Sequence, residues 1–240
     1  DLLPSDSLPR SSLWLSDRGP AAVSPPLLRP RFTLLYYPLA DGRESDGSTA
    51  FLSEKGRNRV ALTGRKEEMD RFLAEIPGLV VKPGQSLARL ATLRIGGPAE
   101  RFVEVTSERA LVGLLTGLAR LDLPFQLLGL GSNVLAPDAG LPGIVARLGG
   151  GLKRIRIRGL RVSAGAGAPL SLVARKASAA GLAGLEALSG FPSTVGGAVF
   201  MNAGCYGTEI KDVLRSARLV ELSGRRRRIE VADLAAGYRS

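Results

Sequence analysis

Hydrophobic and polar positions follow regular periods only from about residue 69 onward. Before that point prolines are frequent, and the only run with a strand-like pattern is 32–37. Proline-rich sequence without a period is typical of linkers and disordered segments, because it offers no continuous apolar face to bury. We therefore predict that residues 1–68 stand apart from the fold of the remaining chain.

The start of the periodic region suggests a specific reason for this division. Met69 is the first methionine, and residues 65–68 can be encoded by a purine-rich stretch that resembles a bacterial ribosome-binding site. One hypothesis is that Met69 is the native start and that residues 1–68 are translated upstream sequence. The alternative is an ordinary charged helix start, since Glu and Lys are good helix formers. Only the DNA sequence distinguishes the two.

Beyond Met69 the spacing of apolar residues predicts alternating helices and strands. Ser107 can cap a helix in which leucines recur at helical spacing. Strand, helix, strand and glycine-rich turn in succession are typical of a small α+β unit with a ligand at the strand end. The predicted helices are 69–76, the segment after Ser107, 170–180 and 232–236; the strands are 101–105, 124–130 and 143–148; the hairpins are 152–166 and 213–231.

The composition excludes several kinds of chemistry. The chain has 240 residues, 45% of them hydrophobic, which is enough for a packed core. It has no histidine, which excludes Ser-His-Asp and Cys-His catalysis within this chain. Cys205 is the only cysteine, so we predict no disulfide and no metal site, and interpret it as a small packing residue. No run of about 18 apolar residues predicts a membrane-spanning helix.

The net charge of +11 suits either a nucleic acid or an anionic nucleotide ligand. The densest basic run is Arg225–Arg228, which directly follows Ser223 and Gly224. We interpret it as one side of a solvated hairpin rather than a nucleic-acid patch, because charge runs alone are weak signals. Aromatic residues make up only 5% of the chain, which leaves few platforms for stacking bases.

Three glycine-rich segments, 94–99, 128–135 and 189–204, carry the candidate chemistry. Without side chains, glycines let successive backbone N–H groups approach an anion, and a pyrophosphate is the natural guest. Ser132 and Asn133 would add hydroxyl and amide contacts. None of the segments is a Walker loop or a dinucleotide fingerprint that opens a long helix. One such cluster is more often a tight turn, but three together favour a nucleotide cofactor.

The amino-acid sequences of these segments resemble the signature motifs of the UDP-N-acetylenolpyruvoylglucosamine reductases. Residues 92–99 resemble the opening motif of this family, and 129–135 resemble its Gly-x-Gly-Ser-Asn-x-Leu pyrophosphate loop. The most specific signature spans 184–213, and the final 237–240 matches the family's Gly-Tyr-Arg-Ser element. The motifs occur in the family's order, and the resemblance covers about 80–240.

The resemblance implies an α+β, FAD-binding PCMH-type (vanillyl-alcohol oxidase-like) fold of two α+β subdomains. Residues 69–148 would form the first FAD-binding subdomain and 149–240 an incomplete second one, with the substrate domain missing. FAD would be held non-covalently, since no histidine is available as a tether. Both ends of the chain are expected to be those of a gene fragment.

The resemblance also implies a reaction, in which NADPH as co-substrate reduces FAD and the flavin reduces UDP-N-acetylenolpyruvoylglucosamine to UDP-N-acetylmuramate for peptidoglycan. Arg239 matches the family's active-site arginine, which would hold the substrate carboxylate and stabilise its developing charge. The family's proton-donating serine and active-site glutamate have no counterpart here, and neither Ser240 nor Glu209 is assigned these roles. The chain is therefore expected to bind FAD but to be inactive alone.

The family's cofactor-binding residues carry over onto two of the glycine-rich segments. The UDP-sugar would be the only partner, with a cytoplasmic, monomeric protein that contacts neither membrane nor nucleic acid. The implied FAD-binding residues are Gly129, Leu130, Gly131, Ser132, Asn133, Leu135, Pro192, Val195, Gly196, Gly197, Ala198, Asn202, Ala203 and Gly204.

Two other functions stay open from the sequence. The first is another FAD-dependent oxidoreductase of the same fold, although the 184–213 signature would not be expected there. The second is a basic nucleic-acid-binding module, which the charge supports but which leaves the glycine-rich segments unexplained. A third possibility is that the chain does not fold alone, because loss of a domain exposes the apolar surface that it covered.

Overall fold

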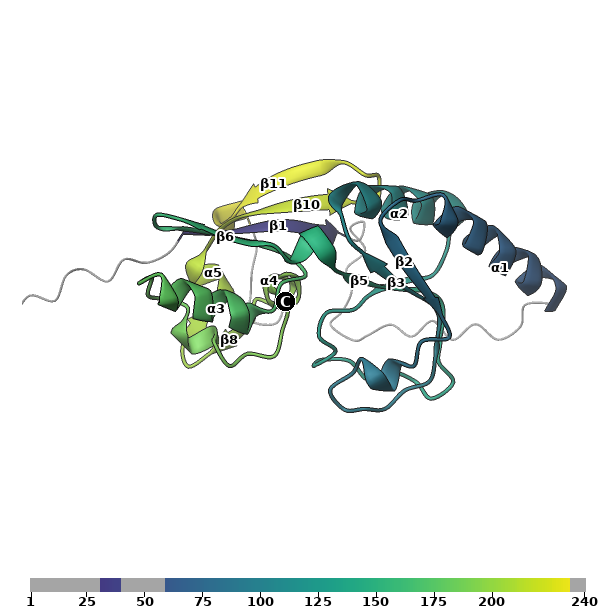
Figure 1. Ribbon diagram of the computed structural model, residues 1–240, viewed down its shortest axis with the longest axis horizontal. Coiled ribbons are helices and arrows are strands. Elements are labelled where there is room, and N and C mark those ends of the chain that lie inside the picture. Colours follow the sequence, from purple (N-terminus) through teal and green to yellow (C-terminus); the bar gives the residue numbers. More distant parts are fainter. Residues whose placement is uncertain (1–30, 40–58, 234–240) are drawn as a thin grey trace, which may run out of the picture.

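The computed structural model describes residues 31–39 and 59–233, with side chains from residue 65 onward. Figure 1 shows two lobes side by side, each built around its own β-sheet. Most of the region predicted to stand apart, 1–68, lies outside the described residues, as do residues 234–236 of the last predicted helix. Within the described residues no helix is both long and apolar enough to cross a bilayer.

The first lobe is a four-stranded sheet with helices on one face. The strand order is β2-β3-β5-β4, with β3, β5 and β4 parallel and β2 antiparallel at the edge. Strand β4 is shorter than predicted, because the chain leaves the sheet after Leu128 to form the glycine-rich turn. The strands are β2 (Leu79–Pro83), β3 (Ala99–Val105), β4 (Phe125–Leu127) and β5 (Leu141–Leu148), with the short helix η1 (Leu87–Arg89) after β2.

Helix α2 (Glu108–Leu121) confirms its sequence prediction in both cap and face. The side chain of Ser107 accepts a hydrogen bond from the N–H of Ala110 at 3.2 Å, which satisfies one of the free donors at the helix start. The predicted apolar positions of α2 are all buried against the sheet: Leu111, Leu114, Leu115 and Leu118.

Helix α1 (Arg59–Ala74) is longer than the helix predicted at 69–76, and Met69 lies inside it rather than at its start. Met69, Phe72 and Leu73 are buried in the same core as α2. The apolar face that the sequence located is therefore correct, but its upstream boundary was wrong. The charged residues before Met69 suggested that the helix begins there. Lys and Glu are good helix formers, however, so they can extend a helix whose next turn is stabilised by burial.

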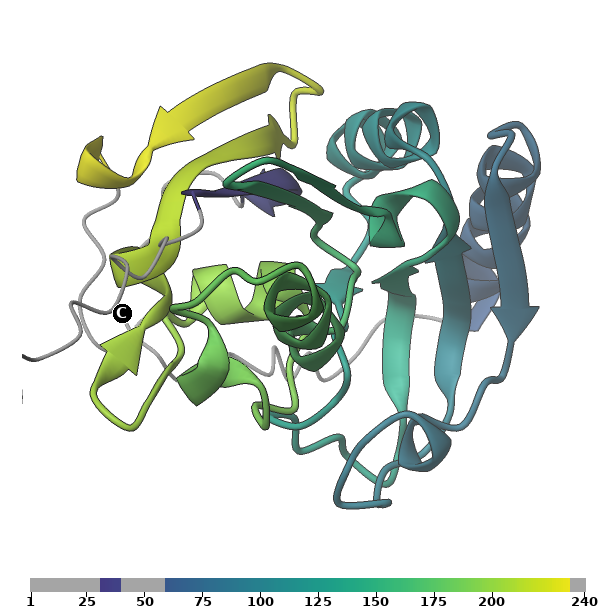
Figure 2. The ribbon, with the colours of Figure 1, turned by 60° about the vertical axis from the view of Figure 1, so that its left-hand side comes forward.

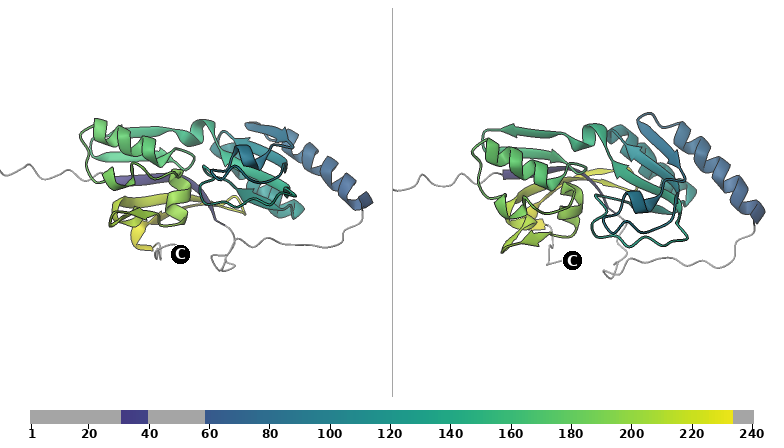
Figure 3. Two further views of the ribbon diagram at one scale, coloured as in Figure 1. Left: turned by 90° about the horizontal axis from the view of Figure 1, so that it is seen from below. Right: turned by 60° about the horizontal axis from the view of Figure 1, so that its bottom comes forward.

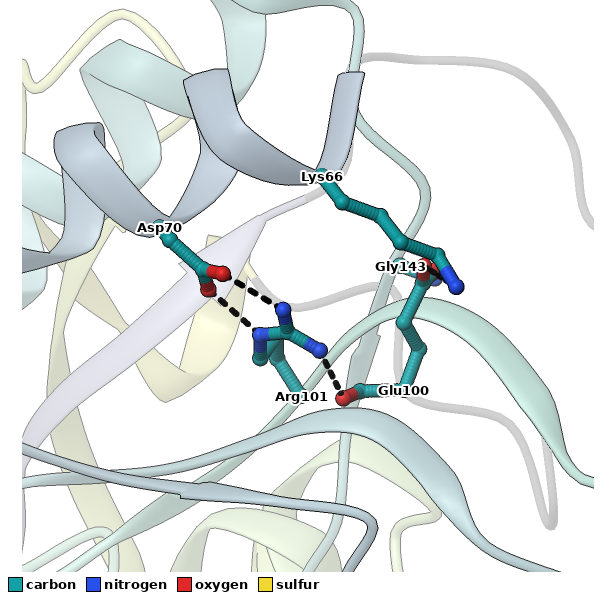
Figure 4. Close-up of polar contacts among 5 residues, drawn as sticks. All are labelled: Lys66, Asp70, Glu100, Arg101 and Gly143. Atoms are coloured by element: carbon teal, nitrogen blue, oxygen red, sulfur yellow. Dashed lines mark hydrogen bonds and ion pairs between the residues drawn. The ribbon is translucent and has the colours of Figure 1, made fainter. Parts of the chain in front are cut away.

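Polar contacts fix α1 to the sheet beside this core (Figure 4). Arg101 of β3 donates two hydrogen bonds of 2.5 Å to the carboxylate of Asp70, and it also donates to the carbonyl of Glu100 at 2.8 Å. The side chain of Glu100 accepts a hydrogen bond from the N–H of Gly143 at 2.7 Å, and Lys66 lies 3.5 Å from the same carboxylate. These contacts join α1, β3 and the start of β5.

The second lobe is a five-stranded sheet with order β11-β10-β1-β7-β6. Strand β1 (Arg31–Leu39) pairs in parallel with both β10 and β7. Figure 2 shows the helices of this lobe beside the sheet, with the four-stranded sheet of the first lobe to the right. The other elements are β6 (Ile155–Arg158), β7 (Arg161–Gly165), α3 (Leu170–Ala179), η3 (Glu186–Leu188), α4 (Val195–Phe200), β8 (Gly204–Cys205), β9 (Thr208–Glu209), α5 (Ile210–Val213), β10 (Leu214–Glu221), β11 (Arg226–Glu230) and η4 (Val231–Asp233).

The structure confirms both predicted hairpins, since β6 pairs antiparallel with β7 and β10 with β11. Three of the four arginines of the run, Arg226–Arg228, lie on the edge strand β11, and each of the three forms an ion pair. Arg226 contacts Glu108 of α2 at 2.8 Å, and Arg228 contacts Glu230 at 2.7 Å. Arg227 lies 3.5 Å from Glu221 of β10. Charged side chains on an edge strand disfavour pairing with other chains, so the run has a role within the fold.

The two lobes meet at the connection between β5 and β6, which includes η2 (Gly150–Lys153). Here the N–H of Gly167 donates to the carbonyl of Leu152 at 3.0 Å, and the N–H of Gly165 donates to the carbonyl of Arg154 at 2.9 Å. A Cβ on Gly165 would lie 2.0 Å from the carbonyl oxygen of Leu152, so only glycine allows this approach. Both views in Figure 3 keep the lobes side by side.

We expect Asp70→Asn to lower the free energy of unfolding by about 1 kcal/mol, because a paired but partly exposed carboxylate contributes on this scale. The hydrogen bonds from Arg101 hold the pKa of Asp70 below its usual value. The carboxylate therefore stabilises the fold above its unfolded pKa, and this contribution disappears as the pH falls through the lowered pKa. Denaturant unfolding of the wild type and the variant at several pH values measures the difference.

Glu67→Gln is the matched control, because Glu67 is an exposed carboxylate on the same helix. A difference between wild type and Asp70→Asn that does not shrink in acid, or that equals the effect of Glu67→Gln, would contradict this role.

Candidate functional site

A cavity of about 620 Å³ lies between the two lobes. This volume is in the range of small-molecule and cofactor sites. Its walls come from α2, β4 and the turn after β4 in the first lobe, and from the segments after β7 and around α4 in the second. The apolar side chains that line it are Leu118, Ala119, Leu123, Phe125, Leu127, Leu128, Leu130, Leu148, Ala166, Pro169, Phe200 and Leu222.

The second glycine-rich segment forms the turn that follows β4. Gly131 adopts φ of 75°, and its carbonyl accepts a hydrogen bond from the N–H of Thr92 at 2.9 Å. A Cβ on Gly131 would lie 2.3 Å from the carbonyl oxygen of Leu90, so this position excludes any side chain. The turn is thereby fixed against residues 90–92, which precede the first glycine-rich segment, and presents Gly129 and Leu130 to the cavity.

The third glycine-rich segment faces this turn from the other lobe. Thr194 caps helix α4, and its hydroxyl accepts a hydrogen bond from the N–H of Gly197 at 3.1 Å. A Cβ on Gly129 would lie 3.0 Å from the same hydroxyl oxygen, which shows how closely the two segments approach. Gly129 from one lobe and Thr194, Gly196 and Gly197 from the other therefore line one cavity.

Two basic side chains, Arg147 and Lys153, line the cavity. The Nε of Arg147 donates to the carbonyl of Gly129 at 2.9 Å, and the Nζ of Lys153 lies 3.8 Å from a carboxylate oxygen of Glu104. Asp122 is the acidic residue among the described lining residues; it precedes β4, whereas Gly129 follows it. The cavity lining thus carries two cations and one carboxylate, and the cation Arg147 contacts Gly129, which favours an anionic ligand there.

The half-buried position of Arg147 affects its ionisation. Burial lowers the pKa of its guanidinium, and the nearby Glu104 carboxylate opposes that shift. Because an arginine starts from such a high pKa, the group stays charged at neutral pH. A charged group that is partly removed from water interacts strongly with a bound anion.

The structure distributes the sequence-predicted site residues unevenly. Four of them line the cavity, namely Gly129, Leu130, Gly196 and Gly197. Val195, Ala198 and Ala203 are buried in the core, and Leu135 is exposed. Arg239 lies outside the described residues. The predicted residues that are not in the cavity lining are Gly131, Ser132, Asn133, Leu135, Pro192, Val195, Ala198, Asn202, Ala203 and Gly204.

The side chain of Asn202, just after α4, makes hydrogen bonds to the segment around α5. Its side-chain amide donates to the carboxylate of Glu209 at 2.7 Å and accepts from the N–H of Lys211 at 3.2 Å. Glu209 also pairs with the Nζ of Lys211 at 2.6 Å, and hydrogen bonds from Lys211 and Asn202 lower the pKa of Glu209. These contacts of Glu209 hold together the chain between α4 and α5.

Sequence reasoning missed Thr194, Arg147, Lys153 and Phe200 as lining residues. For Arg147 a signal was present, since it is the only charged residue in the otherwise apolar strand β5. A charge in an apolar strand requires a partner or a ligand. Thr194 also had a signal, because a threonine before a helix of small residues is a common cap. Nothing in the sequence marked Lys153 or Phe200.

The comparisons with known proteins define the class of this site. The FAD binding domain family matches residues 99–230, which is more than half of the chain. The chain therefore belongs to the FAD binding domain family, and the α+β, FAD-binding fold expected from the sequence is confirmed.

More specific relatives confirm the resemblance to the UDP-N-acetylenolpyruvoylglucosamine reductases. The chain is 42% identical over 156 residues to the enzyme of that name from Caulobacter vibrioides, covering 65% of this chain and 52% of the relative. It is 43% identical over 153 residues to that from Azorhizobium caulinodans, covering 64% of this chain and 49% of the relative. The chain thus spans about half the length of the curated relatives it matches.

A solved structure gives the same result. The crystal structure of UDP-N-acetylenolpyruvylglucosamine reductase (MurB) from Thermus caldophilus matches with a TM-score of 0.57 and 36% sequence identity. The match covers 67% of this chain and 55% of that chain.

The residues of the cavity fit FAD, the cofactor of this family. Apolar side chains such as Phe125 and Phe200 offer surface to a planar ring system, and Arg147 and Lys153 offer positive charge to a pyrophosphate. The described residues contain no group of three or more His, Cys, Asp or Glu side chains that could hold a metal ion. Cys205 is a free, partly buried thiol in β8 and is not among the cavity-lining residues.

We expect Gly131→Ala to lower the free energy of unfolding by about 2 kcal/mol and to weaken FAD binding at least about tenfold. The added Cβ would meet the carbonyl of Leu90 in a backbone conformation that side chains rarely adopt. The displaced turn would then move Gly129 and Leu130. Thermal unfolding and a flavin fluorescence titration measure the two effects.

Gly190→Ala is the control for this variant. Gly190 lies in another glycine-rich segment, and no atom lies within 4 Å of the position of its added Cβ. The prediction fails if the two alanine variants bind FAD with the same affinity as the wild type.

Proposed function

We propose that this chain is the FAD-binding part of a UDP-N-acetylenolpyruvoylglucosamine reductase, which forms UDP-N-acetylmuramate for peptidoglycan in the cytoplasm. The observation that supports it most is the cavity in which the turn at Gly129 meets the turn at Thr194. Both turns belong to segments that resemble motifs of this family, and they come from different lobes.

Different residues of the cavity would bind different parts of FAD. Leu118, Phe125 and Phe200 would exclude water from the apolar part of the cofactor. Backbone N–H groups of the Gly129 turn, with Arg147 and Lys153, would bind its pyrophosphate. When bound, FAD would carry reducing equivalents from NADPH to the enolpyruvyl double bond.

Arg239 is the residue of this chain to which we assign contact with the substrate. A guanidinium that binds a carboxylate through two N–H groups would hold the enolpyruvyl carboxylate and stabilise the negative charge that develops on it. This assignment depends on the Gly-Tyr-Arg-Ser sequence at 237–240.

Cofactor binding tests the proposal directly. The 240-residue chain should purify with a flavin absorbance spectrum, or acquire one with added FAD, and denaturation should release unmodified FAD because binding is non-covalent. Folded protein that neither carries flavin nor takes up added FAD would contradict the proposal.

The same preparation tests the expected division between binding and catalysis. Because the matched relatives are about twice as long as the aligned region, we expect the chain to bind FAD without reducing the enolpyruvyl sugar when NADPH is supplied. Substrate-dependent oxidation of NADPH by the chain alone would contradict this expectation and show that the chain already contains the catalytic groups.

A further inference from the structure

Arg147 occupies an unusual place for a charged residue. It lies in the central part of the first sheet, on β5, between β3 and the chain that leaves β4. Its neighbours in the strand, Ala146 and Leu148, are buried in the core, whereas Arg147 is half-buried and lines the cavity. Since side chains alternate along a strand, the Arg147 side chain lies on the opposite face of the sheet from Ala146 and Leu148, although Leu148 also contributes to the cavity wall.

The contacts of Arg147 fix its orientation but use only part of its hydrogen-bonding capacity. Its Nε donates to the carbonyl of Gly129 at 2.9 Å, and Glu104 is its direct partner in the β3–β5 register. Glu104 is shared with Lys153, whose Nζ lies 3.8 Å from it. No other hydrogen bond of the Arg147 guanidinium is found among the described residues, so its two Nη groups are available to a ligand.

We propose that Arg147 is the residue that couples the glycine-rich turn to the pyrophosphate of FAD. Its Nε holds the carbonyl of Gly129, which keeps the backbone N–H groups of the turn in place, and its Nη groups bind the diphosphate oxygens. This inference rests on the proposed FAD-binding function and adds a side chain that the glycine motifs do not contain. Arg147 is thus a positioning residue for the turn and a cofactor-binding residue at once.

The chemistry of the ligand distinguishes this role from a general effect on the cavity. ADP contains the pyrophosphate without the flavin ring, and riboflavin contains the ring without phosphate. If Arg147 binds the pyrophosphate, its loss lowers the affinity of the chain for FAD and ADP and leaves the affinity for riboflavin unchanged. If Arg147 acted on the ring or on the cavity as a whole, its loss would lower the affinity for riboflavin as well.

The test uses the full chain with Arg147→Gln, Arg147→Lys and the control Arg158→Gln. Arg158 is an exposed arginine on β6 outside the cavity lining, so its substitution removes the same charge from elsewhere. Calorimetric titration with ADP and fluorescence titration with FAD and riboflavin give the dissociation constants at two or more salt concentrations.

We expect Arg147→Gln to raise the dissociation constants for FAD and ADP about tenfold to a hundredfold, as for loss of a hydrogen bond to a charged group. The salt dependence of binding should become shallower, because one screened charge contact is lost. Arg147→Lys should give an intermediate value, since it keeps the charge but not the planar fork. Arg158→Gln should match the wild type.

Two results would overturn the inference while leaving the proposed function intact. One is wild-type affinity for FAD and ADP in both Arg147 variants. The other is a loss of affinity that is equal for riboflavin and ADP. The unfolding temperature without FAD shows whether each variant is folded, and Arg147→Lys carries the comparison if Arg147→Gln is not. A wild-type chain that binds none of the three ligands would instead contradict the proposed function itself.

Discussion

The close backbone contact between the β5–β6 connection and the end of β7 determines how the two lobes lie. Gly165 has no side chain, so its backbone reaches the carbonyl of Leu152, and the N–H of Gly167 donates to that same carbonyl. This contact holds the first residues after β7 beside the last residues of β5. Ala166 and Gly167 on one side and Leu148 on the other consequently become walls of the same cavity.

The properties of the site follow from this arrangement. The turn that carries Gly129 belongs to the first lobe and the cap at Thr194 to the second, so neither lobe alone forms the cavity. Apolar side chains make up most of the lining, whereas Arg147 and Lys153 supply positive charge. A cofactor with an apolar ring system and an anionic diphosphate matches both parts. FAD has both features, and residues 99–230 match the FAD binding domain family.

The sequence predicted those parts of the fold that depend on neighbouring residues. Helix α2 with its Ser107 cap and both hairpins were predictable, because helical spacing, caps and turns are local signals. The start of α1 was not, since the buried position of Met69 depends on contact with α2 and the sheet. Local charge before Met69 suggested a boundary that tertiary packing does not respect.

The candidate site shows the same division between local and non-local information. Family motifs located Gly129, Leu130, Gly196 and Gly197, all of which line the cavity. They did not locate Arg147 or Thr194, whose roles appear only when β5 lies beside the Gly129 turn and when the two lobes meet. The exposure of Leu135 likewise depends on the path of the chain after the turn, which periodicity does not specify.

The central claim is that one FAD molecule binds between the two lobes and contacts both. Hydrogen–deuterium exchange of the full chain with and without FAD tests it most directly. The account predicts slower exchange on FAD addition in the segments around Gly129 and around Thr194, with no change at the edge strand β11. Saturating FAD that protects only one of these two segments, or neither, would contradict it.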